Sequence, residues 1–258
     1  MNHSKRILFY PEIPDDRTVI AKICKSLGYS YSNKLTEDYT FGFKWKDQTY
    51  YTLDSEFISN IGNLKIFNTK CTDISKSYVY ETYSAVFDHI LAVNPLVYSG
   101  SIVSKSDINA KHDGAIFQGP ITEIDPEKSY SILIDNSDGD EVIDYRVPIF
   151  LDRIPIVSIK RRKIITRFEN ENTSVSLAYP EEVFDPDEIE NLLTFANKLG
   201  MEYGELDVLR DKKSKHIYVI DANNTPFGPP SGLPEKDSNH LLEVFCKCFK
   251  ETFIAQAY

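Results

Sequence analysis

Two runs of alternating apolar and polar residues near the C-terminus constrain the fold of this chain most. They cover residues 203–211 and 216–226, and the polar residues 212–215 separate them. Apolar residues at every second position are typical of half-buried β-strands. A short polar connection between two such strands favours a turn. The sequence therefore predicts two neighbouring strands joined by a turn.

Each of these strands carries a carboxylate, Asp207 on the first and Asp221 on the second. Asn223 follows Asp221 by two residues, so both side chains lie on the same face of the strand. Two carboxylates and an amide oxygen on one sheet face suit Mg²⁺, which takes one or two carboxylates and leaves other positions to water and phosphate. An ordinary hairpin with exposed acids explains these residues as well, so both interpretations stay open at this point.

Composition narrows the class of protein. The 258 residues are enough for one large domain or for two to three lobes with real cores. The net charge of −10 argues against a nucleic-acid partner. The four cysteines (Cys24, Cys71, Cys246, Cys248) show neither a CxxC pair nor a zinc-type spacing, which indicates reduced thiols. The apolar run at residues 7–10 is too short for a signal-peptide core or a membrane span, so we expect a cytoplasmic, soluble protein.

The first 70 residues have the pattern of a small α/β lobe. Residues 7–10 read as a buried strand, and a helix is expected to start within residues 15–18 and to run to Leu27, with Gly28 ending it. Further strands are expected at residues 39–43, 48–53 and 64–68. Strands interleaved with a helix predict a mixed α/β layer.

Two lysines stand at positions where phosphate could bind. Asp73 or Ser75 is expected to cap a helix that continues to Phe87, which places Lys76 in its first turn. A lysine there opposes the helix dipole, so it is either a solvated residue or a phosphate ligand acting with the helix N-terminus. Lys105 ends a strand, and the loop of residues 106–114 that follows is polar and ends in a glycine. Such a loop can approach a phosphate or can be an ordinary connection.

The middle of the chain predicts further strands and the helices that follow them. Strands are expected at residues 130–135, 141–150 and 154–159, the last two as a hairpin with Asp144 and Arg146 on one face. The basic run at residues 160–163 is expected to be partly solvated, with one arginine facing a site. Helices are expected at residues 186–199 and 241–253.

In this order the pieces resemble the ATP-grasp superfamily. The likeness covers about residues 68–230 and is closest to peptide ligases such as α-L-glutamate ligases, glutathione synthetase and D-alanine–D-alanine ligase. It is carried by residues 75–77, Lys105, 144–147, 160–162, 167–170, 198–200, 205–208 and 221–226. The resemblance implies an α+β ATP-grasp fold of two α+β lobes, roughly residues 71–130 and 131–258, after a small α/β lobe at residues 1–70.

The resemblance also implies roles for individual residues. Those expected to contact nucleotide, metal or substrate are Lys76 and Lys105 at the phosphates, Leu133 and Asp135 in the hinge beside adenine and ribose, Asp207, Asp221 and Asn223 at Mg²⁺, and Arg146 and Arg162 at the acceptor or the transferred phosphoryl group.

The activity implied is that of an ATP- and Mg²⁺-dependent carboxylate–amine ligase that passes through an acyl phosphate, with small-molecule or peptide acids and amines as substrates. The chain departs from the family pattern at Asp221, where glutamate is usual, and at Glu205, where a D-alanine–D-alanine ligase has arginine. A clear glycine-rich lid is also missing. These departures keep a small-molecule kinase and a non-catalytic nucleotide-binding module open, and the sequence leaves open whether the chain forms a homodimer.

Overall fold

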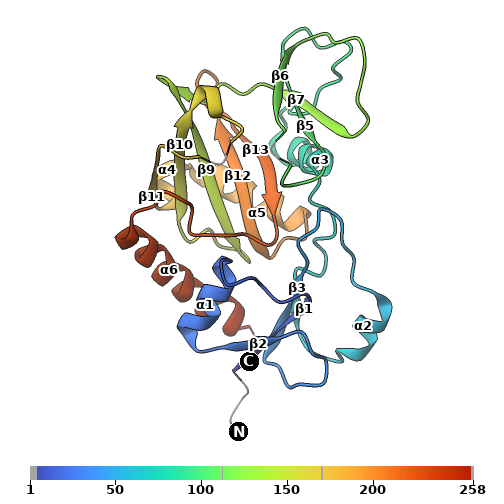
Figure 1. Ribbon diagram of the computed structural model, residues 1–258, viewed down its shortest axis with the longest axis vertical. Coiled ribbons are helices and arrows are strands. Elements are labelled where there is room, and N and C mark those ends of the chain that lie inside the picture. Colours follow the sequence, from blue (N-terminus) through green and yellow to red (C-terminus); the bar gives the residue numbers. More distant parts are fainter. Residues whose placement is uncertain (1–4, 112, 170, 257–258) are drawn as a thin grey trace.

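The computed structural model describes residues 5–111, 113–169 and 171–256, and it contains three β-sheets (Figure 1). The N-terminal sheet is parallel and has the order β2-β1-β3-β4. Its strands are β1 (Arg6–Pro11), β2 (Ser30–Ser32), β3 (Phe41–Trp45) and β4 (Ile66–Phe67), and its helices are α1 (Val19–Leu27) and α2 (Ser55–Asn60). This part of the chain is therefore an α/β lobe, as its pattern predicts.

The first helix begins and ends where the sequence predicts. The Thr18 hydroxyl accepts a hydrogen bond from the backbone N–H of Ala21, and Gly28 adopts a left-handed φ of 68° that ends the helix. The predicted strand at residues 48–53 is wrong, because this segment is a loop in which Tyr50 makes one isolated bridge to Asp73. That bridge still brings the loop to the second part of the chain.

A small antiparallel sheet follows, with the order β6-β5-β7. Its strands are β5 (Ser101–Ser106), β6 (Ala115–Gln118) and β7 (Lys128–Ile132), and helix α3 (Lys76–Phe87) precedes it in the chain. Ser75 caps α3 by accepting a hydrogen bond from the N–H of Tyr78, so the predicted helix start is confirmed.

The largest sheet is antiparallel and has the order β11-β10-β9-β12-β13, with β8 paired to β9. Its strands are β8 (Ser137–Asp138), β9 (Glu141–Phe150), β10 (Val157–Lys163), β11 (Ser174–Ala178), β12 (Tyr203–Arg210) and β13 (Ile217–Asn223). The connecting helices are the 3₁₀ turn Ile164–Thr166, α4 (Pro180–Val183) and α5 (Pro186–Lys198). The hairpin β12–β13 is thus confirmed. The strand predicted at 154–159 is displaced towards the C-terminus, so the basic run lies inside β10 and not beyond it.

The two faces of this sheet differ in chemistry because side chains alternate along each strand. Val147, Leu206 and Val219 point to the back, where they join a core with Tyr83 of α3 and Phe195 of α5. The opposite face carries Arg146, Glu205, Asp207 and Asp221 of the same strands, and it is the face that can hold a polar site.

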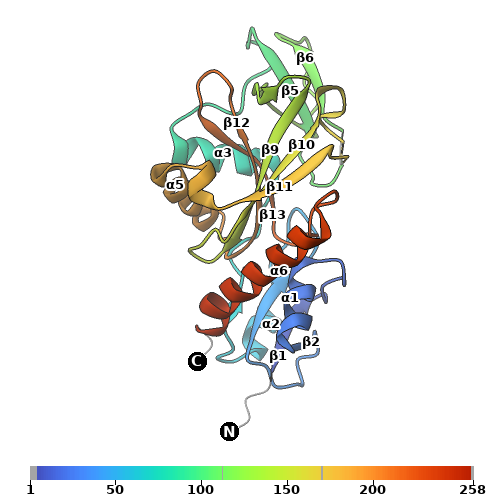
Figure 2. The same ribbon diagram turned by 90° about the vertical axis from the view of Figure 1, so that its left-hand side faces the viewer.

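The C-terminal helix α6 (Glu235–Phe249), continued by a π-helical turn (Lys250–Ile254), returns to the N-terminal lobe (Figures 1 and 2). It starts six residues before the predicted Leu241. Phe245, Phe249 and Phe253 share one core with Phe41 and Phe43 of β3. The predicted division near residues 70 and 130 stays a prediction, but the last twenty or so residues pack with the first lobe.

The remaining sequence predictions concern thiols and membranes. All four cysteines are free and buried. No helix in the described part of the chain combines the length and apolar character that crossing a membrane requires.

Candidate active site

A cavity of about 720 Å³ lies against the polar face of the large sheet. Its walls come from β9, β10, β12 and β13, from β5 and β7 of the small sheet, from the start of α3 and from residues 47–50 of the N-terminal lobe. Seven of the predicted site residues line it together: Lys76, Lys105, Arg146, Arg162, Asp207, Asp221 and Asn223. Residues that are up to 147 positions apart in sequence therefore share one cavity.

Strand register places the acidic residues side by side. Asp207 of β12 lies directly opposite Asp221 of β13, and Glu205 lies opposite Asn223. On the other edge of β12, Arg146 of β9 is the register partner of Asp207. Directly paired residues in a sheet have neighbouring side chains, so these pairs form two adjacent rows of polar groups across the floor of the cavity.

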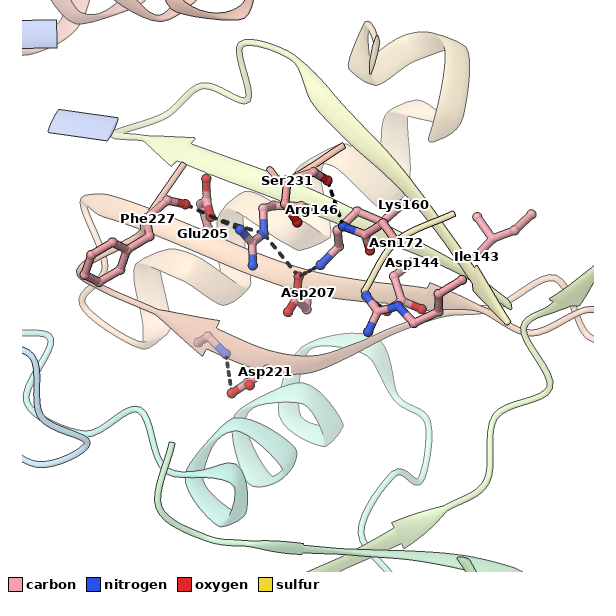
Figure 3. A network of polar contacts seen from close by, with 12 residues as sticks. Ile143, Asp144, Arg146, Lys160, Asn172, Glu205, Asp207, Asp221, Phe227 and Ser231 are labelled. Atoms are coloured by element: carbon pink, nitrogen blue, oxygen red, sulfur yellow. Dashed lines mark hydrogen bonds and ion pairs between the residues drawn. The ribbon is translucent and has the colours of Figure 1, made fainter. Parts of the chain in front are cut away.

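Asp207 is held by two cations (Figure 3). Lys160 Nζ donates a hydrogen bond to Asp207 Oδ1 at 2.9 Å, and Arg146 Nε lies 3.6 Å from the same oxygen. Burial alone would raise the pKa of Asp207, but Lys160 and Arg146 outweigh it and hold the pKa well below its ordinary value. The group is therefore a carboxylate at neutral pH.

Glu205 also lines the cavity, although its sequence position was noted only as a departure from the family pattern. Its side chain is 8% exposed, and Oε2 lies 3.3 Å from Arg146 Nε. Burial raises the pKa of Glu205 to about 7, and the charge of Arg146 offsets only part of this. Alternation along β12 could have identified it, because Glu205 and Asp207 are two residues apart. Arg146 of the neighbouring strand β9 lies beside this carboxyl group.

Asp221 and Asn223 form the other side of the acidic group. Lys76 Nζ lies 3.7 Å from Asp221 Oδ1, and burial raises the pKa of Asp221 against the effect of Lys76. Asn223 Oδ1 accepts a hydrogen bond from the backbone N–H of Thr225. Among the described residues no three His, Cys, Asp or Glu side chains converge as a metal site. An ion here would thus take the two aspartates with amide, water or phosphate oxygens.

Both predicted lysines lie in the cavity. Lys76 has a side chain only 8% exposed, and its Nζ donates a hydrogen bond to Asn109 Oδ1 at 3.0 Å. The alternative of a solvated first-turn lysine is therefore wrong. Lys105 lies over the ring of Phe168, 5.6 Å from its centroid, and burial lowers its pKa.

The basic run divides between the two faces of β10. Lys160 and Arg162 face the cavity, whereas Arg161 and Lys163 face away and pair with Asp138 and Asp140. Arg162 is bound in an ion pair with Asp144, 2.9 Å between the charged atoms. Arg162 is the arginine of this run that lines the cavity. Lys160 was missed because the strand was expected to end before it.

The predicted hinge residues Leu133 and Asp135 do not line the cavity, although their neighbours Ile132, Ile134 and Asn136 do. The segment joins β7 to β8, and Asp135 turns to accept hydrogen bonds from Ser137. The side-chain roles predicted for Leu133 and Asp135 are therefore not supported by their placement. Alternate residues of the same hinge reach the cavity instead.

Comparison with known proteins identifies the fold. No protein-family model and no curated protein matches the sequence. Among solved structures, the ATP-grasp ligase PsnB in complex with precursor peptide PsnA2 and AMPPNP is similar with a TM-score of 0.62 at 10% identity, over 100% of this chain and 98% of that chain. PsnB with a minimal precursor, Mg and ADP has a TM-score of 0.61 at 11% identity, over 100% and 99%.

A second kind of ligase has the same architecture. D-alanine–D-alanine ligase from Bacillus anthracis is similar with a TM-score of 0.57 at 12% identity, over 98% of this chain and 97% of that chain. At these identities the likeness establishes the fold. The chain has the α+β ATP-grasp fold that its sequence resembles, including the small lobe that precedes it.

Proposed function

We propose that the protein is an ATP- and Mg²⁺-dependent ligase that joins a carboxylate to an amine through an acyl phosphate. The observation that carries this proposal is the convergence of Lys76 and Lys105 with Asp207 and Asp221 in one cavity. Phosphoryl transfer needs little covalent help from a protein. It needs positioning, cations and a metal ion held by carboxylates, and this cavity contains lysine and arginine side chains together with two aspartates that would hold such an ion.

The donor set fits Mg²⁺. Asp207, Asp221 and Asn223 present hard oxygen atoms on adjacent strands, and Asp207 stays ionised because Lys160 and Arg146 lower its pKa. When bound there, Mg²⁺ would neutralise charge on phosphate oxygens. The three side chains would hold it, and open coordination positions would be left for water and phosphate.

The nucleotide would lie between the two sheets. Lys76 and Lys105 approach from α3 and β5, opposite the acidic residues of β12 and β13. The hinge residues Ile132 and Ile134 give the same cavity an apolar wall, which suits an adenine ring. ATP would supply the phosphoryl group that the substrate carboxylate accepts, and the amine would then displace phosphate from the acyl phosphate to give the amide.

Arg146 is the residue best placed for the reacting carboxylate. Its Nε is directed to Glu205 and Asp207, and its Nη1 reaches the carbonyl oxygen of Phe227 at 3.5 Å. A guanidinium so oriented can stabilise negative charge that develops on the acyl group. Arg162 is tied to Asp144 and to the carbonyl of Glu169, so we assign it to shaping the phosphate side of the cavity.

The substrates would enter from the N-terminal lobe. Residues 47–50 and Phe227 line the cavity on that side. Because PsnB, a protein of the same fold, has been seen with precursor peptides, peptide acids and amines belong in the first substrate panel together with free amino acids.

The test is ADP formation from Mg-ATP with a panel of acids and amines, followed by product mass. Wild type and Asp221→Ala are compared, and Asp138→Ala is the control because Asp138 lies on the outer face and is 59% exposed. We expect an amide product and ADP from wild type and the control only. Equal turnover by Asp221→Ala would remove the metal assignment, and a stable phosphorylated product would identify a kinase instead.

A further inference from the structure

Asn109 contacts three separate parts of the molecule. Its Oδ1 accepts a hydrogen bond from Lys76 Nζ at 3.0 Å, and its Nδ2 donates to the backbone carbonyl of Ala222 at 3.0 Å. Its backbone N–H donates to Thr49 Oγ1, also at 3.0 Å. Helix α3, strand β13 and the N-terminal lobe therefore meet at one asparagine.

Each of these contacts has a consequence for the site. Ala222 lies between Asp221 and Asn223, so the bond to its carbonyl fixes the backbone that carries both side chains. The ammonium group of Lys76 is held between Asn109 Oδ1 and Asp221 Oδ1, at 3.0 and 3.7 Å. A flexible lysine side chain loses about 2 kcal/mol of rotamer freedom when it is fixed, so it needs such partners to stay in one place.

The loop that carries Asn109 is held by further contacts. Asp107 accepts hydrogen bonds from the N–H and hydroxyl of Ser77 and from the hydroxyls of Ser129 and Tyr50. Ala110 has a φ of 62°, a left-handed conformation that residues other than glycine seldom adopt. A strained residue persists where surrounding contacts determine the backbone, so these contacts fix the direction of the loop at Asn109.

We propose that Asn109 is a positioning residue through which the N-terminal lobe fixes the ammonium group of Lys76 beside Asp221. Thr49 is buried, 7% exposed, and orients the Asn109 backbone, and the Asn109 side chain then orients Lys76. The inference rests on the proposed function, because Lys76 is taken as a ligand of the nucleotide phosphates. It adds a residue from a loop that carries no recognisable phosphate-binding motif.

The first experiment measures Mg-ATP affinity by titration calorimetry for wild type, Asn109→Ala, Thr49→Val and the double variant. Loss of a hydrogen bond to a charged group predicts a Kd about tenfold higher for Asn109→Ala. Thr49→Val keeps the side-chain volume but loses the acceptor, and we expect about threefold. The double variant should bind no more weakly than Asn109→Ala, because Thr49 acts through Asn109.

Asn94→Ala is the matched control. Asn94 is an exposed loop asparagine whose Oδ1 caps the N–H of Leu96, and it does not line the cavity. Its replacement should leave the Kd for Mg-ATP unchanged. Asn109→Gln is the conservative variant, since its amide keeps both an acceptor for Lys76 and a donor for the carbonyl of Ala222, and it should restore part of the affinity that alanine loses.

The second experiment needs no nucleotide. Competitive acetylation with peptide mass spectrometry reports the reactivity of Lys76 in the free protein. We expect Lys76 to be modified several-fold faster in Asn109→Ala than in wild type, with the exposed Lys163 as the internal reference. Thermal unfolding of the same samples shows whether the whole fold has loosened, in which case buried lysines such as Lys44 would gain reactivity too.

The outcomes separate the two proposals. If wild type fails to bind Mg-ATP, the proposed function falls, and the acetylation result alone decides whether Asn109 orders Lys76. If wild type binds and Asn109→Ala binds equally well with unchanged Lys76 reactivity, Asn109 has no positioning role while the proposed function stands. A general gain of lysine reactivity in Asn109→Ala would assign the residue to stability and overturn the inference.

Discussion

Lys76 Nζ lies 3.7 Å from Oδ1 of Asp221, and this short distance joins helix α3 to strand β13 across the cavity. The lysine belongs to the group predicted to bind phosphate and the aspartate to the group predicted to bind a metal ion. Both are largely removed from solvent, with side chains 8% and 32% exposed. A phosphate that carries a bound cation needs both kinds of group within a few ångströms, and the fold supplies them from elements 145 residues apart.

The two lysines should contribute to nucleotide affinity separately. Lys76→Met and Lys105→Met each remove a charged donor while keeping an unbranched side chain, so we expect the Kd for Mg-ATP to rise about 10- to 100-fold in each. Lys163→Met, on the outer face of β10 and paired with Asp140, is the control and should bind as wild type does. Titration calorimetry measures all three. Unchanged affinity in both cavity variants would contradict the phosphate assignment.

The pair of Arg146 and Glu205 makes a prediction about stability. At pH 8.5, above the Glu205 pKa of about 7, Arg146→Met leaves the buried Glu205 without its nearest cation, so its carboxyl group must stay charged unpaired or take up a proton. Either outcome should lower the free energy of unfolding by about 1–3 kcal/mol. Adding Glu205→Gln removes the unpaired charge and should recover most of this loss. Urea unfolding of the single and double variants gives the comparison. Additive losses in the double variant would show that the two side chains do not interact.

Asp107 links stability to pH. Burial would raise its pKa, but hydrogen bonds from Ser129, Ser77 and Tyr50 outweigh burial and lower the pKa below the ordinary value of 3.8. The pKa of Asp107 is thus lower in the folded chain than in the unfolded chain. The contribution of Asp107 to the free energy of unfolding is therefore fully present above its unfolded pKa, and it is lost as the pH falls through its folded pKa. Asp107→Asn should therefore cost about 1–3 kcal/mol at pH 6.

The difference between Asp107→Asn and wild type should shrink as the pH is lowered below about 3.8. Urea unfolding at pH 6, 4.5 and 3.5 measures it. Asp140→Asn is the control, since Asp140 pairs with the exposed Lys163 and its side chain is 80% exposed. A difference that stays constant over this pH range would show that the Asp107 contacts do not depend on its charge.

The sequence predicted much of the large sheet, because apolar and polar residues alternate along β9 and the first part of β12. The pairing of β12 with β13 shifts register after Asp207, so Val219 lies in the core and Asp221 in the cavity although they are two residues apart. The strand pattern predicted that Asp207, Asp221 and Asn223 share one sheet face, whereas the role of Arg146 came from the family resemblance.

The prediction of site residues was less accurate in the segment that follows β7. The predicted strand at residues 130–135 ends at Ile132 in β7. The roles of Leu133 and Asp135 came from the family resemblance, whereas Ile134 and Asn136 reach the cavity.

Contacts between distant segments were the second feature that the sequence did not predict. The contact of Asn109 with Thr49 joins two loops 60 residues apart, and nothing local in either loop signals it. Lys160 was missed because the predicted strand ended at residue 159. Had the strand been extended through the basic run, alternation would have placed Lys160 and Arg162 on the same face. The apolar face of α6 was visible in the sequence, but an amphipathic helix does not reveal which sheet it covers.

Helix α6 provides the last prediction, since it joins the end of the chain to the first lobe. Phe249 is fully buried, and its ring lies 6.1 Å from that of Phe41 and 5.1 Å from that of Phe253. Phe249→Ala should lower the free energy of unfolding by about 3–5 kcal/mol through lost burial and a cavity, and Phe249→Leu should lose less. Ile165→Ala is the control, because Ile165 is 93% exposed and such changes stay within about 0.5 kcal/mol.

Urea unfolding followed by far-UV and near-UV circular dichroism measures the loss in Phe249→Ala. Because α6 shares its core with β3, both signals should shift together in Phe249→Ala, and a loss no larger than that of Ile165→Ala would mean that this helix does not hold the N-terminal lobe.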